Sequence, residues 1–442
     1  MRGWIRRLLV PVAAAVMLAA PGTLPAAAAD GTAEQDVRTA IEHVPGLTVL
    51  EERPAAPGLR FFVLQLRQPI DHRHPEAGTF QQRITLLHKA VDRPTVLWTG
   101  GYQVPLDPAR SEPATLLDGN QLNVEQRFFG TSVPSATDYR TLTIEQAADD
   151  HHRVVEAFRS VYRGRWISAG GSKGGMATVY HRRFHPGDVD GSIAYSAPDN
   201  VDDREDSAYL DFLATAGTPE CRAALRTVQR EALLRRDELV ARYADRAARD
   251  GTGFTVIGSA DKAFEIAVLR LPFTFWQSGG QAACPTVPGT GTPTDDLDRW
   301  IDRTGRLTVY TDRVARDFIP YFYQLGTQMG YFDVETAHLA DLLRYPGATE
   351  PRSFVPRDIP MRHQPGAMRD IDRWVRTAGT RLLFLNGRLD PSVAEPFRLG
   401  PGSRDSYVLW DPDAAHATRI GELPDAERAV ATATLMRWAG LD

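Results

Sequence analysis

The feature that most constrains the fold is a run of glycines around one serine, Gly170-Gly171-Ser172-Lys173-Gly174-Gly175. It contains the pattern Gly-x-Ser-x-Gly and stands between residues 165–169, which we expect to form a strand, and residues 176–184, which we expect to form a helix. A turn this tight leaves no room for a Cβ two residues before or after the serine. The setting therefore predicts a nucleophile elbow that exposes the Ser172 hydroxyl at a sheet edge, rather than a chance match in a glycine-rich chain.

A serine hydroxyl is a weak nucleophile unless a base activates it, and the elbow predicts the order serine, acid, histidine along the chain. Asp390 follows an expected strand at 381–385, and His416 follows the next one at 406–409. We expect the Asp390 carboxylate to orient the imidazole through Nδ1, so that Nε2 of His416 accepts the Ser172 proton.

Both assignments have simpler alternatives. Asp390 precedes Pro391 and could be an ordinary turn residue, and His416 could be a surface loop histidine. Asp411 and Asp413 compete for the role of the acid, but they lie too close to His416 in sequence to come from a separate strand end. No other histidine follows Asp390 in the chain, which favours His416 as the base.

An acyl-transfer site also needs hydrogen-bond donors for the negative oxygen of the transition state. The elbow predicts the backbone N–H of Lys173 as one donor. The second should come from the loop after an expected strand at 95–99, where Gly101 and Tyr102 stand. The alternative is that this loop is an ordinary glycine turn.

The order of expected elements indicates the fold class. Strands are expected at 61–66, 82–87, 95–99, 165–169, 191–195, 381–385 and 406–409, and helices at 145–161, 176–184 and 425–438. Strands that alternate with helices indicate a mostly parallel sheet covered on both faces. Strand patterns vanish from 199 to 345, where helices are expected at 221–248, 264–276 and 300–325.

We therefore predict an α/β-hydrolase fold with an inserted helical cap. The 442 residues divide into a signal peptide at 1–29, a first part of the hydrolase domain at 30–198, the cap at 199–345 and the second part of the hydrolase domain at 346–442.

The first residues have the pattern of a secretory signal. Arg2, Arg6 and Arg7 precede an apolar stretch at 8–20, and small residues at 26–29 offer a cleavage site. No other uninterrupted apolar run reaches about 18 residues, so we expect no membrane association after cleavage and a secreted, extracellular protein. A net charge of −5 gives no reason to expect nucleic acid as a partner.

Cysteine usage agrees with export. The chain has two cysteines, Cys221 and Cys284, and in an exported protein we expect them to form one disulfide, the alternative being two unpaired thiols. We find no Cys/His set with metal-ligand spacing and expect no metal or other cofactor. His151-His152 beside Asp149-Asp150 superficially suggests a metal site, and we interpret it as a solvated helix face.

Several stretches together resemble a known family. They are 68–72 with 79–83, 125–132, 142–147, 170–175, 323–328, 386–391 and His416. The chain resembles the secreted actinobacterial prolyl tri- and tetrapeptidyl aminopeptidases and, more distantly, the lysosomal prolylcarboxypeptidase and dipeptidyl peptidase group. Gln328 stands where the lysosomal group tends to carry Glu, Phe128-Phe129 replaces a Tyr pair, and that group's multiple disulfides are missing, which favours the bacterial branch.

The resemblance implies a helical cap over an α/β-hydrolase domain, a triad of Ser172, Asp390 and His416, and cleavage near the N-terminus of peptides, often after proline. An aminopeptidase must also bind a free ammonium group, for which it needs a carboxylate. Glu125 is the first candidate, although it could instead pair structurally with an arginine such as Arg127.

Aromatic residues could line a slot for proline. The candidates are Phe273 and Trp276 with Tyr323, and their neighbours Phe275 and Tyr321, although aromatic residues at such spacing also occur in ordinary cores.

The sequence thus predicts a monomeric secreted serine aminopeptidase that releases short peptides, tripeptides first, from free N-termini, with proline as a candidate for the last residue released. The alternatives are a secreted esterase or lipase on the same triad, and a non-catalytic binding protein.

Overall fold

The computed structural model describes residues 31–135 and 138–441, so the expected signal peptide at 1–29 lies outside the described residues. Within them, one sheet has nine strands in the order β1-β2-β3-β5-β4-β6-β7-β8-β9. The strands are β1 (Leu47–Arg53), β2 (Arg60–Pro69), β3 (Thr79–His88), β4 (Thr95–Trp98), β5 (Asn120–Val124), β6 (Trp166–Gly171), β7 (Gly191–Tyr195), β8 (Leu382–Gly387) and β9 (Tyr407–Asp411).

Strand direction divides the sheet into two parts. β1, β2, β3 and β5 pair antiparallel in sequence, whereas β5, β4, β6, β7, β8 and β9 all run parallel. The carboxyl ends of the parallel strands therefore meet at one edge of the sheet, where ligand sites of open α/β sheets lie. This topology, with a helix packed directly after β6, is the α/β-hydrolase fold, so the predicted fold class is confirmed.

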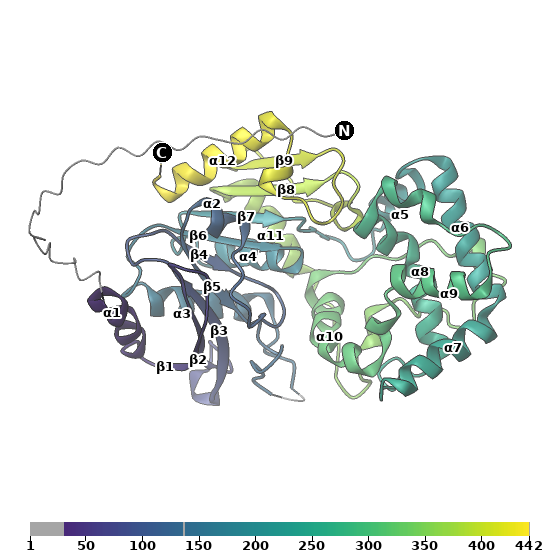
Figure 1. The fold of residues 1–442 in the computed structure, drawn as a ribbon, viewed down its shortest axis with the longest axis horizontal. Coiled ribbons are helices and arrows are strands. Elements are labelled where there is room, and N and C mark those ends of the chain that lie inside the picture. Colours follow the sequence, from purple (N-terminus) through teal and green to yellow (C-terminus); the bar gives the residue numbers. More distant parts are fainter. Residues whose placement is uncertain (1–30, 136–137, 442) are drawn as a thin grey trace, which may run out of the picture.

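Helices cover both faces of the sheet (Figure 1). One face packs against α1 (Gly31–Glu42), α3 (Ile144–Phe158), α4 (Lys173–Phe184) and α11 (Gly366–Ala378). The other face packs against α2 (Glu112–Leu116) and α12 (Asp425–Ala439), whose Leu435 and Trp438 bury against Ile167 and Ile193. Both faces of the central strands are thus removed from water, as a parallel sheet requires.

Two strands, β1 and β5, were not predicted from the sequence, for physical reasons. β1 lies in a segment for which the sequence analysis expected no strand, and its side chains are mostly exposed. β5 has the polar sequence Asn-Gln-Leu-Asn-Val, yet all five residues are buried. Its Asn120 side chain satisfies backbone groups of the neighbouring loop, Lys89 N–H at 2.7 Å and Ala90 C=O at 2.8 Å. Buried polar side chains that are bonded to backbone give no hydrophobic pattern.

Between β7 and α11 the regular elements of the described chain are helices. The longer helices are α5 (Ser207–Thr215), α6 (Pro219–Leu234), α7 (Arg236–Arg249), α8 (Ala260–Gly279), α9 (Thr294–Thr304) and α10 (Asp312–Gln324). Short 3-10 turns, η2 (Gln281–Thr286) and η3 (Leu307–Tyr310), connect them, and α10 continues into a π-helical turn, η4 (Leu325–Met329). Further 3-10 turns along the chain are η1 (Pro75–Ala77), η5 (Ala337–Leu339), η6 (Pro351–Phe354), η7 (Pro391–Val393) and η8 (Ile420–Glu422).

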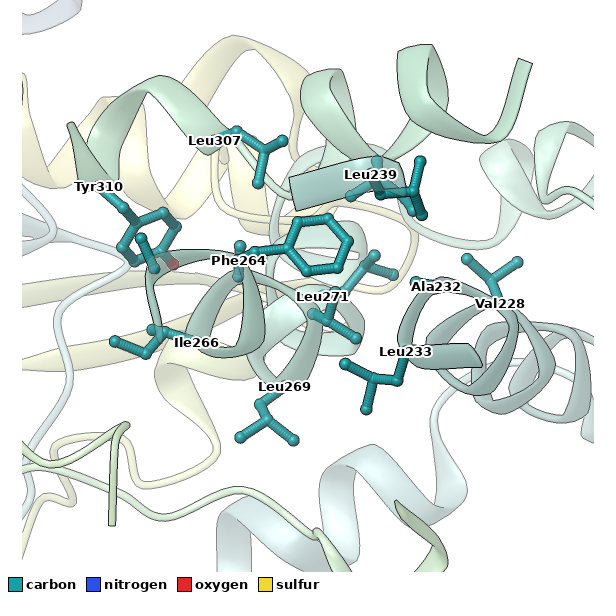
Figure 2. Close-up of a cluster of buried hydrophobic side chains, with 14 of the residues drawn as sticks. Val228, Ala232, Leu233, Leu239, Phe264, Ile266, Leu269, Leu271, Leu307 and Tyr310 are labelled. Atoms are coloured by element: carbon teal, nitrogen blue, oxygen red, sulfur yellow. The ribbon is translucent and has the colours of Figure 1, made fainter. Parts of the chain in front are cut away.

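This helical segment has its own hydrophobic core. Figure 2 shows side chains of α6, α7 and α8 meeting there, with Phe264 and Leu271 of α8 among Val228, Leu233 and Leu239. A disulfide between Cys221 and Cys284 ties α6 to η2.

The helix bounds expected at 221–248 and 300–325 were wrong in detail. The first is two helices that meet at Arg235, and the second is broken at Arg306, whose φ of 51° is left-handed. The domain limits at 198/199 and 345/346 stay predictions. Among the described residues, no helix has the length and apolar content that a bilayer crossing requires.

Candidate active site

The serine of the glycine run stands on the sharp turn between β6 and α4. Ser172 has φ 54° and ψ −124°, a backbone conformation that costs energy for a residue with a side chain and is typical of nucleophile elbows. Its N–H donates to the carbonyl of Tyr195 at the end of β7, at 2.8 Å. The strain is therefore held in place by the adjacent strand.

The glycines are required where two backbone segments cross. A Cβ on Gly170 would lie 2.4 Å from the carbonyl of Gly174, and a Cβ on Gly174 would lie 2.9 Å from the carbonyl oxygen of Gly100. By contrast, a Cβ on Gly171 would meet nothing within 4 Å. The two glycines of the Gly-x-Ser-x-Gly pattern are thus sterically constrained, as is Gly175, where a Cβ would lie 2.9 Å from the Ala197 Cβ.

The candidate acid and base are in direct contact. Asp390 lies after β8 and His416 after β9, and the His416 Nδ1 is 2.8 Å from the Asp390 Oδ2. The other carboxylate oxygen, Oδ1, accepts the N–H of Ser392 at 2.9 Å. Since the Asp390 side chain is fully buried while that of His416 is 25% exposed, the imidazole has one nitrogen held by the acid and one side open to the cavity.

Two neighbouring segments of the chain hold the His416 loop. Ser196, just after β7, donates its hydroxyl to the His416 carbonyl at 3.0 Å. The His416 N–H donates to the carbonyl of Gln277, a residue of α8, at 3.2 Å, and the Gln277 amide donates to the Ser392 hydroxyl at 2.9 Å. The helical segment therefore supports both the acid and the base from above the sheet.

Ser172 and His416 open into the same cavity of 660 Å³, between the sheet edge and the helical segment. Lys173 and Tyr102 line it as well. The loop that carries Tyr102 approaches α4 closely, since a Cβ on Gly101, whose φ is +85°, would lie 2.8 Å from the Gly174 nitrogen. This loop and the start of α4 thus meet beside Ser172, where the two expected donors would have to be.

Comparison with known proteins assigns the chain to a family. A model of the family described as PS-10 peptidase S37 matches residues 30–442. The chain belongs to the peptidase S37 family. A prolyl tri/tetrapeptidyl aminopeptidase of Streptomyces mobaraensis is 49% identical over 446 residues, which cover 100% of this chain and 93% of that protein. The resemblance drawn from the sequence is therefore confirmed.

Solved structures of more distant proteins have lower sequence identity to this S37 peptidase. A proline iminopeptidase of Mycobacterium smegmatis is 16% identical with a TM-score of 0.37, over 85% of this chain and 98% of that one. A post-proline cleaving enzyme of Rickettsia typhi is 12% identical with a TM-score of 0.35, over 86% of this chain and 38% of that one.

Aromatic side chains form much of the cavity wall of the S37 peptidase, but only some are those expected from the sequence. Phe273 and Tyr321 line the cavity. Trp276 does not, because it is fully buried in the core of the helical segment against Phe275. Tyr323 packs instead on Tyr139, with ring centroids 5.2 Å apart. Other aromatic residues of the wall, which the sequence analysis did not single out, are Phe318, Phe322, Tyr331 and Phe332.

Lys173 directly follows Ser172 and has a buried, ionisable side chain. Its ammonium group is buried, donates to the Gly101 carbonyl, and lies 4.5 Å from the ring centroid of Phe129 and 5.1 Å from that of Tyr102. Burial lowers the pKa of Lys173 well below its ordinary value. The side chain therefore joins α4 to the loop that carries the second expected donor.

Glu125, the expected ammonium ligand, is buried and bonded to groups of the protein itself. The residue is 1% exposed, and its Oε1 accepts the N–H and the hydroxyl of Thr131 and of Ser132, at 2.8 to 3.1 Å. Its Oε2 accepts the N–H of Val104 at 3.2 Å. The carboxylate thus stabilises the turn that the chain makes after β5. Arg127, the alternative partner considered for Glu125, instead forms a buried ion pair with Asp150 at 2.7 Å.

The histidines of α3 and α4 do not form a solvated face. His151 is buried, and burial lowers its pKa to about 3. His152 stacks on His185 with centroids 4.0 Å apart and planes 5° apart, while Asp188 receives hydrogen bonds from His152 and His181 at 2.8 Å. One ligand atom each of His152, His185 and Asp188 lies within 4.8 Å of the others, a spacing that the sequence analysis did not anticipate.

Proposed function

We propose that this peptidase is exported and releases tripeptides, with proline as the last residue released, from the free N-termini of peptides. Family membership and the relative from S. mobaraensis support a serine exopeptidase rather than an esterase, a lipase or a non-catalytic binding protein. The observation that carries the mechanism is the buried Asp390 carboxylate, 2.8 Å from the His416 imidazole, beside a cavity that Ser172 also lines.

In the proposed reaction, the His416 Nε2 takes the proton of the Ser172 hydroxyl as the oxygen attacks the carbonyl of the scissile bond. The resulting oxyanion accepts hydrogen bonds from the N–H of Lys173 and from the N–H of Tyr102 or Gly101. His416 then passes the proton to the leaving amine, and an acyl-enzyme remains on Ser172. Water, activated by the same imidazole, attacks the ester and restores the serine hydroxyl.

The cavity supports a small apolar residue next to the cut. Phe273, Tyr321 and their aromatic neighbours form flat apolar walls. The pyrrolidine ring of proline can pack on such walls because it needs no hydrogen-bond partner. The helical segment lies over the cavity, which favours a chain end over the middle of a folded chain as substrate. Export rests on the charged and apolar pattern of residues 1–29, and N-terminal sequencing of the extracellular protein should give Asp30 as the first residue.

Three chromogenic substrates test the proposal: the p-nitroanilide of Ala-Ala-Pro with a free N-terminus, its N-acetylated form, and a p-nitrophenyl ester. We expect rapid turnover of the free tripeptide anilide, little turnover of the acetylated one, and none by Ser172→Ala. Equal turnover of free and blocked peptides would reject the aminopeptidase, and activity confined to the ester would favour an esterase. Mass spectrometry of fragments released from longer peptides would then give the number of residues removed per cut.

A further inference from the structure

Acidic residues gather beside the active-site cavity, where β7 and β8 end. Asp199 follows β7, Glu395 follows η7 beyond β8, and the Asp199 N–H donates to the Glu395 carbonyl at 2.8 Å. Asp206 lies at the start of α5. We call Asp199, Asp206 and Glu395 the acid cluster. β7 lies next to β6 and β8 lies next to β7, so the same sheet edge that carries Ser172 also carries this cluster.

Two residues connect the acid cluster to the cavity. Asn200 and Tyr209 both line its wall. Asn200 directly follows Asp199 in the chain, and the Tyr209 N–H donates to the Asp206 carbonyl at 3.0 Å, so both wall residues adjoin the acid cluster. Burial raises the pKa of the Tyr209 phenol, and the charges of Glu395, Asp199 and Asp206 raise it further. Arg270 also lines the cavity, and its guanidinium lies over the rings of Tyr331 and Phe332, 5.0 and 5.2 Å from their centroids.

The polar atoms of this region lack partners in the part of the chain that the structure describes. Asn200 is 5% exposed and its amide oxygen accepts no hydrogen bond, and the same holds for one carboxylate oxygen of Asp199, which is 4% exposed. One carboxylate oxygen of Asp206 and one of Glu395 are also buried without a partner. Gly330 fixes the Asn200 side chain, since a Cβ there would lie 2.9 Å from its Cγ.

Several carboxyl groups lie close together here. Arg398 acts on both Asp199 and Glu395, whereas Asp372 adds a further carboxyl group that hydrogen-bonds to Asp199. Burial first, and then these like charges, raise the pKa of Asp199, and burial raises that of Glu395 to about 7. Raised pKa values favour the protonated, neutral carboxyls in the empty site, and a cation that donates hydrogen bonds would stabilise their charged forms.

We propose that the α-ammonium group of the peptide substrate binds at the acid cluster and donates a hydrogen bond to the amide oxygen of Asn200 on the cavity wall. This inference rests on the proposed aminopeptidase function. A substrate ammonium supplies one positive charge and three N–H donors, which match the acceptors that are left without partners. An acetylated N-terminus brings neither the charge nor enough donors, so the site would select free chain ends.

The test measures kcat/KM for the free and the N-acetylated Ala-Ala-Pro p-nitroanilide in the wild type, Glu395→Gln, Asp199→Asn and Asn200→Ala. For each variant we expect kcat/KM for the free substrate to fall about 10- to 100-fold, the size of a lost charge-assisted hydrogen bond, and kcat/KM for the acetylated substrate to stay within about 3-fold. The matched control is Glu335→Gln, an exposed carboxylate of the helical segment that pairs with Arg226, which should change neither value.

The rate of Ser172 labelling by a small fluorophosphonate gives a second measurement, since it needs a folded site but no ammonium group. We expect wild-type labelling in all the variants. If the wild type itself accepts free and acetylated substrates equally, the aminopeptidase function fails. If the wild type prefers the free over the acetylated substrate and the three variants keep the same preference, the aminopeptidase function stands and the acid cluster is not the ammonium site.

Discussion

Replacing Glu125 by glutamine has an effect that can be worked out atom by atom. The carboxylate accepts hydrogen bonds from Thr131 and Ser132 at Oε1 and from the Val104 N–H at Oε2. In Glu125→Gln the amide oxygen can keep the first set, but the NH2 group must then face the Val104 N–H. An unsatisfied buried N–H costs about 1–3 kcal/mol. The amide oxygen of the glutamine accepts weaker hydrogen bonds from Thr131 and Ser132 than the carboxylate does. This loss is offset because a neutral amide is less costly to bury than a carboxylate.

We therefore expect the free energy of unfolding, measured by urea denaturation followed by tryptophan fluorescence at neutral pH, to fall by about 1–3 kcal/mol. Glu125→Ala leaves the backbone N–H groups of Val104 and Thr131 without an acceptor, whereas the Ser132 N–H keeps the Phe129 carbonyl at 2.9 Å. The change should cost about 2–6 kcal/mol, a large share of a typical domain stability. The preference of Glu125→Gln for free over acetylated substrate should equal that of the wild type. Unchanged stability together with a lost preference would show that Glu125 binds the substrate.

Three further predictions concern the triad, the elbow and acid stability. Asp390→Asn puts an NH2 group against the His416 Nδ1 and favours the wrong tautomer, so kcat should fall about 1,000- to 10,000-fold in steady-state assays, and a loss below about 10-fold would contradict the role of Asp390. Gly170→Ala should lower the melting temperature strongly, whereas Gly171→Ala, which has open space, should leave stability within about 0.5 kcal/mol; equal effects would refute the steric account. Burial and a nearby arginine lower the pKa of His88 to about 4. Its contribution to stability is thus complete above about pH 6.5 and lost as the pH falls toward 4, and His88→Gln should remove that part of the acid destabilisation in urea titrations between these pH values.

The elbow could be predicted from the sequence because its constraint is local. Glycines at fixed spacing around Ser172, between a strand and a helix, describe a backbone crossing that few sequences allow. The contact between Asp390 and His416 could be anticipated because parallel strands deliver their carboxyl ends to one edge of the sheet. Both inferences require only the order of the strands along the chain, and not a knowledge of how the side chains pack.

Substrate recognition could not be predicted in the same way, because it depends on how side chains pack. α8 is buried along most of its length, so the sequence does not distinguish Phe273, which lines the cavity, from Trp276, which lies in the core. Glu125 was singled out as an acid near a strand end, but the chain reversal that consumes its oxygens gave no sequence signal. Asp199 and Glu395 are almost two hundred positions apart in sequence and meet only because β7 and β8 are adjacent.

The most direct test of the mechanism is to locate the reactive hydroxyl and its base chemically. Tandem mass spectrometry after exposure to a fluorophosphonate should find a single modified residue, Ser172. We predict rapid labelling of the wild type, none of Ser172→Ala, and labelling of His416→Ala slowed by at least about 1,000-fold, since without the imidazole the hydroxyl has no proton acceptor. Labelling at another residue, or an unchanged rate in His416→Ala, would contradict the account.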